Sequence, residues 1–563
     1  MRYRPPRNKW GADFAEDYER NLEDIERDIT GVEEIVEGSK TNAEQALTFA
    51  TEAKGKAESV QAQFNQVVIE GDSSVEAAQA RVDAKNVAQP TLKARLDKDY
   101  NEVTAQLAEK AKQTDVTSLS NKRKRRTRKE GSYKITKFAF PSNFGWANAP
   151  INIFTDGINY FTDFEVSAFK NISVNTYWVD PINGSNANTG TSSSPFLTIE
   201  KAYTVAAAGD TIMLKDGIYF RDRSWLGTTA IKKSINIIAQ NKGGVTIPFC
   251  DRHTYTLNSG NVYQVARSNV RDVVDFTFHE WGYRYTKVNS IAECQALSGS
   301  WYTDGTTLYV HSLTGGIPDS TKVYPILTGV HFKAVNDTAD VIVYMEGIKI
   351  IGGDYGIWFD RLNTSNQMSL YGKAIEVIYT TGNDGNADSF NIDGVDYAFF
   401  QDSVAVFSNK DGFNYTSYAS DGLFKNAPKF IEVNCIGANN GLKNSIVGSE
   451  HTNNGSTAHG GAKGIRLNCT YFGNMGGNLV DVQNGTQSLN FSLTVYDPQT
   501  KTSDMYNTNI CTQQEGAEMW VYGAVTFGAA FDIYAVTGSS IYIYDSEFES
   551  KNGGGTMEIV NPI

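Results

Sequence analysis

Residues 177–220 constrain the fold of this chain more than any other stretch. Residues 177–179 are a short apolar run, and residues 180–195 are almost all Pro, Gly, Asn, Ser and Thr, which favour loops. Residues 198–208 combine helix formers with an apolar face, and residues 211–214 are a second short apolar run. The stretch therefore predicts a strand, a loop, one short helix and another strand.

This order resembles the opening of right-handed parallel β-helix proteins of the pectate-lyase superfamily. The resemblance rests on Y-W-V-D-P from residue 177, G-T-S-S-S-P-F-L-T-I from residue 190 and A-G-D-T-I-M-L-K-D-G-I-Y from residue 208. It implies that residues 176–247 supply the capping helix and first coils of a β-helix. Asn186 stands where such proteins often carry an acidic residue.

The rest of the chain supports a solenoid. Residues 331–563 repeat short β-branched runs separated by Gly, Asn and Asp, and Val-Asn-Cys at 433–435 is followed 34 residues later by Leu-Asn-Cys at 467–469. Repeats about 20–35 residues long are typical of stacked coils with loop excursions. Residues 248–330 instead carry hairpin patterns such as W-Y-T-D-G-T-T-L-Y-V-H. A similar hairpin in other extracellular β-helix proteins implies a lateral β insert.

A heptad pattern marks the N-terminal part. Apolar residues alternate at spacings of three and four from Leu22 to Val67, interrupted only by Ser39. This predicts a coiled coil within residues 1–70, expected to be trimeric; an amphipathic helix in a bundle is the alternative. The expected fold class is thus mainly β, a right-handed parallel β-helix with a lateral β insert, preceded by an α-helical trimeric coiled coil.

Residues 71–130 read as a helical segment followed by a basic linker, N-K-R-K-R-R-T-R-K. The linker is either a solvated hinge or a cluster for an anionic partner. Residues 71–100 resemble a segment of tail fibre and baseplate proteins from phages of Gram-positive bacteria. That resemblance implies that residues 1–70 attach to a virion. The aromatic, β-rich residues 131–175 are expected to form a β neck or cap.

Composition limits the partners and the compartment. The net charge of −13 argues against nucleic acid as a partner. No run approaches 18 apolar residues, so no membrane insertion is expected, and the first residues do not read as a signal peptide. The five cysteines lack metal-ligand spacing and are expected to be buried thiols. These features favour a protein made in the host cytoplasm and carried in a virion tail or appendage.

Candidate site residues come from an acidic stretch and the coils that follow it. Polysaccharide chemistry needs a carboxylate pair or a base, sometimes with a cation to neutralise a uronate. The order D-G-F-N-Y, V-N-C-I-G-A-N-N-G, N-G-S-T-A-H-G-G-A-K resembles phage and bacterial β-helix proteins described as pectate-lyase-like. The predicted catalytic stripe is Asp411, His451, His459 and Asp481, with Asp384, Asp388, Asp393, Lys463 and Arg466 as substrate-binding residues. The alternative is that each Asp is an ordinary turn residue and each His a solvated loop residue.

Three functions follow from these patterns. The first is a virion tail fibre or spike, a homotrimer that contacts other tail or baseplate proteins and binds teichoic acid or another host cell-wall polysaccharide. The second is a depolymerase, a lyase or hydrolase, on the same β-helix. The third is a purely structural fibre. No metal site and no cofactor are expected, although a divalent cation stays open.

Overall fold

The computed structural model describes residues 135–560 except 158, 225–229, 383–386, 442–452 and 500–505. The chain divides into two compact units, 1–132 and 133–563, and the described residues belong to the second. The predicted coiled coil and basic linker therefore lie outside the described residues. Among helices of the described part, none has both the length and the apolar character needed to cross a bilayer.

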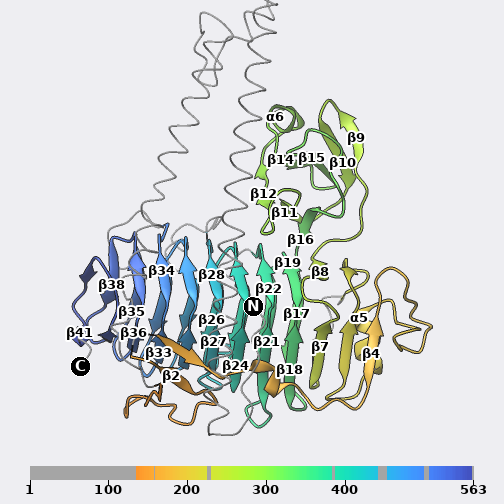
Figure 1. The fold of residues 1–563 in the computed structure, drawn as a ribbon. Helices are drawn as coiled ribbons and strands as arrows, with labels where there is room; N and C mark the ends of the chain where they lie inside the picture. The colour runs from red at the N-terminus through yellow and green to blue at the C-terminus, as the bar shows by residue number, and fades with distance from the viewer. Residues whose placement is uncertain are drawn as a thin grey trace, which may run out of the picture. The chain divides into compact units, whose positions relative to one another are not determined.

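Three long parallel sheets wind into a solenoid (Figure 1). From β18 to β38 each coil passes through sheet 1, sheet 2 and sheet 3 and returns to sheet 1 one rung further along, as β21, β22 and β23 do. Neighbouring strands pair in parallel, for example Leu370 of β21 with Ala398 of β24. The predicted parallel β-helix is confirmed.

Sheet 1 has twelve strands, and sheets 2 and 3 have nine each. The strands of sheet 1 are β4 Thr176–Val179, β5 Thr211–Leu214, β7 Ile235–Ala239, β18 Val341–Glu346, β21 Met368–Lys373, β24 Tyr397–Gln401, β27 Lys429–Val433, β30 Lys463–Leu467, β33 Gln487–Phe491, β36 Glu518–Tyr522, β39 Ser540–Tyr544 and β41 Thr556–Val560. Those of sheet 2 are β6 Gly217–Ile218, β8 Val245–Pro248, β19 Ile348–Ile351, β22 Glu376–Ile378, β25 Val404–Val406, β28 Ile436–Ala438, β31 Thr470–Phe472, β34 Thr494–Tyr496 and β37 Val525–Phe527. Those of sheet 3 are β17 Val330–Val335, β20 Tyr355–Asp360, β23 Phe390–Asp393, β26 Phe413–Thr416, β29 Ser456–Ala458, β32 Leu479–Val482, β35 Thr508–Gln513, β38 Phe531–Ala535 and β40 Lys551–Asn552.

The repeated Val-Asn-Cys and Leu-Asn-Cys triplets form the corner between sheets 1 and 2. Asn434 and Asn468 adopt left-handed φ values of 55° and 59°, which Asn tolerates better than most residues. The Nδ2 atom of Asn468 donates to Oδ1 of Asn434 at 3.2 Å, and Asn434 donates to Asp402 of the previous coil at 2.9 Å. The corner residue faces outward and bonds along the stack, and the following cysteine is buried.

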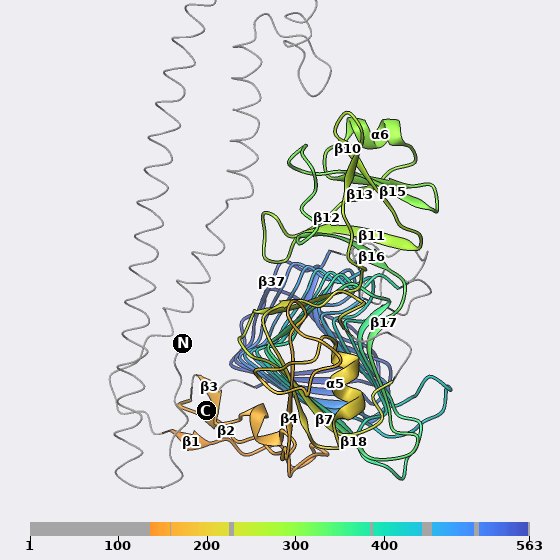
Figure 2. The same cartoon turned by 90° about the vertical axis from the view of Figure 1, so that its right-hand side faces the viewer.

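The interior is a continuous apolar core in which equivalent residues of successive coils stack. Phe390 and Phe413 of successive coils stack at 4.8 Å between ring centroids, and across the core Tyr415 of sheet 3 stacks on Phe430 of sheet 1 at 4.0 Å. Helix α5, Ile199–Val205, packs its buried Ile199 into the same core and lies at the end of the first coils (Figure 2). The hydroxyl of Thr198 caps α5 by accepting from the backbone N–H of Lys201 at 3.1 Å.

Residues 135–175 run along the outer face of sheet 1 as a strap. Its elements are β1 Thr136–Lys137, β2 Ile153–Thr155, β3 Tyr160–Thr162 and the 3₁₀ helix η2 Val166–Phe169. Phe138 packs edge-on against Tyr522 of β36 at 4.8 Å, whereas Asn171 bonds Asn236 of β7 at 3.0 Å. The segment predicted as a neck or cap thus covers a flank of the solenoid from the late coils back to the first.

The lateral insert is a pair of mainly antiparallel sheets above sheet 2 in Figure 1, in which only β13 and β14 pair in parallel among the described strands. Its elements are β9 Thr256–Ser259, β10 Val262–Ala266, β11 Val270–Asp275, β12 Tyr283–Arg284, β13 Thr286–Lys287, α6 Ile291–Ala296, β14 Ser300–Thr303, β15 Thr307–His311 and β16 Val323–Leu327. In the β14–β15 turn, Asp304 accepts from the backbone N–H groups of Thr306 and Thr307 at 2.8 and 2.7 Å. The insert packs Val274 and Ile326 against outward residues of sheet 2 such as Ile378.

Candidate functional site

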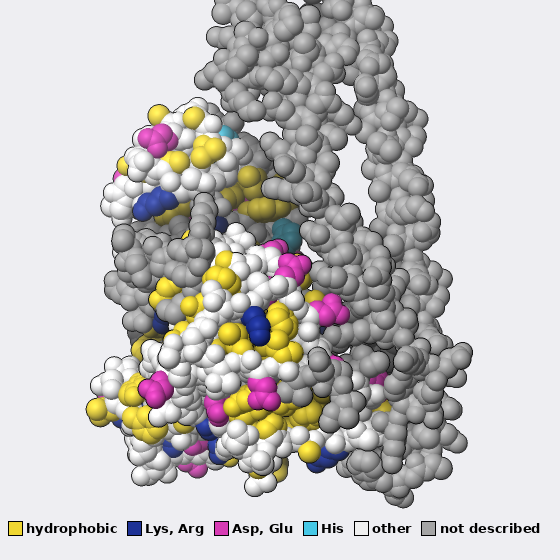
Figure 3. Space-filling view, turned by 90° about the vertical axis from the view of Figure 1, so that its left-hand side faces the viewer, with side chains coloured by type: hydrophobic (Ala, Val, Ile, Leu, Met, Phe, Trp, Pro, Cys, Tyr) yellow, Lys and Arg dark blue, Asp and Glu magenta, His cyan; other side chains and the backbone are white. Residues whose placement is uncertain are grey.

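Over the described residues, neither the strap nor the insert packs on the outer face of sheet 3 between β20 and β26. The strap packs on sheet 1, and the insert packs on sheet 2 and reaches sheet 3 only at its first strand, where Phe249 meets His331 at 4.7 Å. The face of the molecule drawn in Figure 3 shows charged side chains dispersed among apolar and polar ones, so charge alone does not mark a site there.

Polar side chains line up across three strands on the outer face of sheet 3. Trp358 of β20 pairs with Asn391 of β23, which pairs with Asn414 of β26. A pocket of about 440 Å³ opens over this row. Its walls are Tyr355, Trp358, Asn391, Asp393, Lys410, Asn414, Thr416, Tyr418, Ala419, Ser420 and His459. The pocket thus joins residues of four consecutive coils.

Asp393 is the carboxyl that reaches this pocket. Its Oδ2 atom accepts from Nε1 of Trp358 at 2.8 Å and from Nδ2 of Asn391 at 3.0 Å. Burial raises the pKa of Asp393 to about 8 despite the Trp358 hydrogen bond, and the nearby carboxylates of Asp360 and Asp388 act in the same direction as burial. Asp393 is therefore protonated at neutral pH and has a proton to give.

Asp388 and Asp411 lie behind the pocket wall. Asp388 accepts from the backbone N–H of Asp411 at 3.0 Å and from Nδ2 of Asn414 at 2.9 Å, and lies 3.6 Å from Nζ of Lys410. Burial, followed by the charge of Asp388, raises the pKa of Asp411 to about 8. Asp411 is 2% exposed and accepts from the backbone N–H of Asn454 at 2.6 Å, so it supports the wall and does not face the pocket.

Lys410 and His459 complete the ionisable set. Burial lowers the pKa of Lys410, but the nearby acidic groups, Asp388 first, outweigh burial and raise that pKa, so Lys410 keeps its charge. His459 bonds Oγ1 of Thr457 through Nε2 at 3.1 Å, and loss of water contact lowers the pKa of His459 to about 4. The pocket therefore presents a neutral acid, a cation and a neutral imidazole.

The aromatic residues of the pocket differ in how open they are. Trp358 stacks on Tyr355 at 4.9 Å, and Nζ of Lys333 lies 3.6 Å from the centroid of the Trp358 ring. Trp358 is thus a fixed wall. Tyr418 is 45% exposed at the rim, with Phe424 edge-on at 5.9 Å, and can meet the apolar face of a sugar ring.

One polar atom in the pocket wall lacks a partner among the described residues. Asn414 is 6% exposed, its Nδ2 donates to Asp388 and Asn391, and its Oδ1 accepts no hydrogen bond. A buried amide oxygen without a donor costs free energy, about 1–3 kcal/mol. A bound hydroxyl group or water would remove that cost.

Three of the predicted site residues lie elsewhere. Asp481 and Arg466 point into the solenoid, where Nη2 of Arg466 lies 3.1 Å from Oδ1 of Asp481 and both side chains are fully buried. Lys463 lies on sheet 1 and donates to the backbone carbonyl of Gly485. Asp481 cannot be catalytic at a surface and Arg466 cannot bind a polymer, because neither reaches solvent; both predictions are wrong. Lys463 lies on sheet 1 and not on sheet 3, and it does not line the pocket, so it is removed from the site.

The remaining predicted residues divide into two groups. Asp384 and His451 fall outside the described residues. Asp388, Asp393, Asp411 and His459 are brought together, with Asp393 and His459 facing the pocket. Sequence reasoning missed Trp358, Tyr355, Asn391, Asn414 and Lys410. The available signal was the pair F-N-I-D at 390–393 and F-N-Y-T at 413–416, in which an apolar residue alternates with a polar one.

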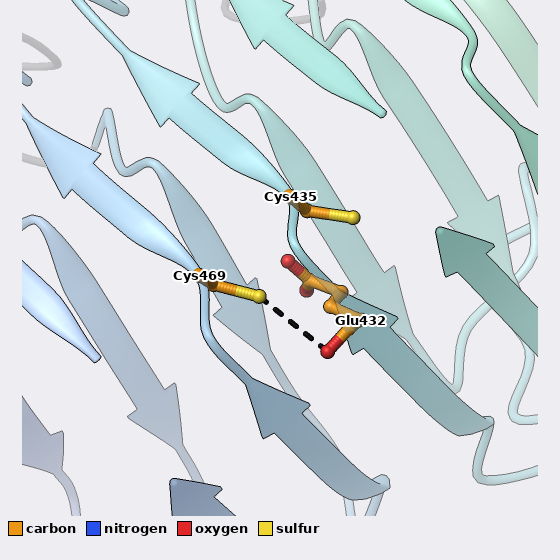
Figure 4. A group of neighbouring side chains, drawn as sticks. All are labelled: Glu432, Cys435 and Cys469. Atoms are coloured by element: carbon orange, nitrogen blue, oxygen red, sulfur yellow. Dashed lines mark hydrogen bonds between the residues drawn. The ribbon is translucent and has the colours of Figure 1, made fainter. Parts of the chain in front are cut away.

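Glu432, Cys435 and Cys469 are a candidate metal centre by proximity, since their ligand atoms lie within 4.8 Å of one another (Figure 4). The site is inside the solenoid, and the carboxylate of Glu432 already accepts from Ser456 and Tyr471 at 2.7 Å each. Sγ of Cys469 donates to the backbone carbonyl of Glu432 at 3.4 Å, and burial raises the pKa of the Cys435 thiol. Protonated thiols and a saturated carboxylate fit a packed interior better than a metal ion.

Comparisons with known proteins give a family match over one stretch and distant structural similarities over most of the chain. Residues 182–270 match the family described as protein of unknown function, DUF1565. No curated protein matches the chain. Similar solved structures include XylC with xylose, at 14% identity over 68% of this chain and 69% of that one, TM-score 0.42. The mannuronan C-5 epimerase AlgE4 A-module of Azotobacter vinelandii matches at 11% identity over 70% and 98%, TM-score 0.30. The tailspike gp49 of Pseudomonas phage LKA1 matches at 12% identity over 69% and 83%, TM-score 0.23. At these TM-scores the similarities do not assign a chemistry to this chain.

Proposed function

We propose that the chain is a carbohydrate-binding attachment protein whose pocket on sheet 3 holds units of a surface polysaccharide. The observation that carries this proposal is Asn414, whose unpartnered Oδ1 lies in the wall of an open pocket. Around it, Asn391 and Thr416 supply further hydrogen-bonding groups, and Tyr418 supplies an exposed ring at the rim. A few placed polar groups with an aromatic side chain are what sugar recognition requires.

The attachment role is the finer part of the proposal. The chain would be a tail fibre or spike of a virion, a homotrimer joined through the heptads between Leu22 and Val67, that binds teichoic acid or another cell-wall polysaccharide. The heptad pattern and the resemblance of residues 71–100 to tail proteins support it. Three copies of a weak pocket would multiply affinity by avidity.

Binding of the purified full chain to host cell walls tests the proposal. Tyr418→Ala removes the open ring at the pocket, and Tyr283→Ala in the insert is the matched control, since the two tyrosines are 45% and 46% exposed. We expect Tyr418→Ala to weaken wall binding at least fivefold and Tyr283→Ala to leave it within twofold. Equal binding by the two variants and the wild type would refute the pocket as the receptor site.

A second function, cleavage of the bound polymer, is favoured by the protonation state of the pocket. Asp393 would donate its proton to the glycosidic oxygen that leaves. Neutral His459 would accept a proton, either from attacking water in a hydrolase or from the sugar ring in a lyase, where Lys410 would neutralise a uronate. In each route Asp393 loses one proton and His459 gains one, so the number of protons on the two groups together does not change.

Release of soluble fragments from walls or purified polymers separates the two functions. Turnover that Asp393→Asn abolishes while wall binding persists supports a depolymerase. Binding without release under all conditions leaves the attachment role alone, and the structural-fibre alternative requires that wall binding also be absent.

A further inference from the structure

A second pocket, of about 350 Å³, lies where the insert joins the first coils. Its walls are Arg221, Asp251, Ala266, Arg267, Ser268, Asn269, Thr306, Leu327 and Thr328. Neither the pocket on sheet 3 nor the proposed attachment role uses these residues. Junctions between domains are common places for ligand sites.

Positive charge is concentrated around this pocket. Arg221 and Arg267 share the carboxylate of Asp251, with Nε to Oδ1 at 3.4 Å and Nη1 to Oδ2 at 2.6 Å. Next to them, Arg223 and Arg252 share Asp222, at 2.8 and 2.7 Å. Four guanidinium groups thus meet two carboxylates. The excess is positive in a chain whose net charge is −13.

The two pocket arginines keep unused hydrogen-bond donors. The guanidinium of Arg221 lies 5.5 Å from the centroid of the Phe249 ring, and only its Nε is engaged, so its terminal nitrogens have no partner among the described residues. Nε of Arg267 is buried and has no hydrogen-bond partner among the described residues. Arg267 is held in place by Nη1 on Asp251 and by Nη2 on the backbone carbonyl of Arg252 at 3.2 Å.

The other walls of the pocket add neutral donors. Ser268, Thr306 and Thr328 carry hydroxyl groups, and Asn269 carries an amide. Asn269 adopts a left-handed φ of 57°, and the backbone N–H of Arg267 donates to the carbonyl of Thr306 at 2.9 Å, which fixes this turn against the β14–β15 hairpin. The pocket is therefore rich in donors and has one carboxylate, Asp251, which is already shared by two arginines.

We propose that this pocket binds an oxyanion, the phosphodiester or carboxylate group of an anionic polymer. An arginine fixed on an aromatic ring with free terminal nitrogens matches the paired oxygens of phosphate and carboxylate. The site is separate from the sheet 3 pocket and would give the insert a binding role of its own. A phosphate-bearing wall polymer and a uronate polymer share this chemistry.

Calorimetric titration of the full chain at fixed ionic strength tests the site. The probes are inorganic phosphate, poly(glycerol phosphate), polygalacturonate and, as the uncharged control, dextran. We expect phosphate and at least one anionic polymer to bind, with Arg221→Gln weakening both at least tenfold. Arg252→Gln is the matched control, because it removes the same charge from a side chain that is 59% exposed and does not line the pocket.

The outcomes are separable. A loss confined to Arg221→Gln supports the site, and the tighter of the two anionic polymers identifies the source of the oxyanion. Equal losses in Arg221→Gln and Arg252→Gln would show general charge attraction and overturn the proposal, as would absence of phosphate binding. If Arg221→Gln does not fold, Arg221→Lys keeps the charge without the paired nitrogens, and unchanged binding in that variant overturns the proposal. Binding of inorganic phosphate does not involve the sheet 3 pocket. The phosphate titration therefore tests the oxyanion site even if the wall-binding experiment refutes the attachment role.

Discussion

The protonated Asp393 makes stability depend on pH in a direction opposite to that of most carboxylates. The pKa of Asp393 is raised in the fold to about 8 from an ordinary value of 3.8. Between these pH values the native state keeps a proton that the unfolded state releases. Stability from this group is therefore fully present below pH 4 and is lost as the pH rises toward 8.

The size of the effect follows from the shift. Each pKa unit corresponds to about 1.4 kcal/mol, so a shift of about four units sets an upper limit of about 6 kcal/mol at pH 8. Buried sites respond with a higher effective dielectric than dry protein, so about 2–4 kcal/mol is the working expectation. Asp393→Asn keeps an oxygen for the Trp358 and Asn391 donors and cannot ionise. The variant should thus gain stability over the wild type as the pH rises.

The assay compares unfolding midpoints of wild type and Asp393→Asn at pH 5 and pH 8.5. We expect the variant to gain relative to the wild type by at least 2 kcal/mol between the two pH values. Asp421→Asn is the control, because hydrogen bonds from Lys425 and the Leu423 backbone lower the pKa of the fully exposed Asp421, which stays ionised over this range. Infrared spectra at pH 6 add a direct readout, the carboxylic acid C=O band that Asp393→Asn should reduce.

Two results would refute the reasoning. If the difference between the variant and the wild type is the same at both pH values, Asp393 does not titrate between them. If Asp393→Asn leaves the carboxylic acid band unchanged at pH 6, Asp393 is ionised there, and the assignment of Asp393 as a proton donor fails with it.

Three further changes test the surrounding structure. Asp481→Asn leaves the buried Arg466 with Glu432 as its remaining ionic partner, at 3.6 Å, and should lower stability by about 3 kcal/mol in denaturant unfolding. Asn468→Ala places an alanine at a left-handed φ of 59°, which alanine tolerates less well than asparagine, and it removes the hydrogen bond to Asn434. The free energy of unfolding should fall by about 1–2 kcal/mol in the same assay. Trp358→Phe removes the Nε1 donor to Asp393, and the pH midpoint of the carboxylic acid band should move upward.

The sequence predicted the solenoid because its corners and strands have local signatures. Asn434 and Asn468, which are left-handed in the structure, recur in the Val-Asn-Cys and Leu-Asn-Cys triplets, and short β-branched runs form the strands between the corners. The helix at 199–205 also followed from local signals, its helix-forming residues and its apolar face. The path of residues 135–175 along sheet 1 could not be predicted, because it depends on contacts such as that of Phe138 with Tyr522, which are far apart in sequence.

The candidate site was predicted in part for a related reason. In a strand with a period of two, a shift of one residue exchanges the inside and the outside. Asp393 and Asp481 both lie in short strands of sheet 3, yet Asp393 faces the pocket, whereas Asp481 faces Arg466 in the interior. Because turns of irregular length separate the strands, the sequence does not show which residues of each strand point inward and which point outward. A prediction based on acidic residues alone therefore included Asp481, which faces the interior, together with Asp393, which faces the pocket.

The outward rows of side chains on the three sheets differ in polarity. Strands stack about 4.8 Å apart, so equivalent outward side chains form continuous rows. On sheet 1 the row includes Tyr371 and Phe399, and on sheet 2 it includes Ile378; these apolar rows are stabilised by the strap and the insert that bury them. On sheet 3 the row is polar at Asn391 and Asn414 and becomes apolar at Val480 and Cys511, which are buried. The polar part of this row, which lines the pocket, is therefore the surface of the solenoid best suited to a polymer.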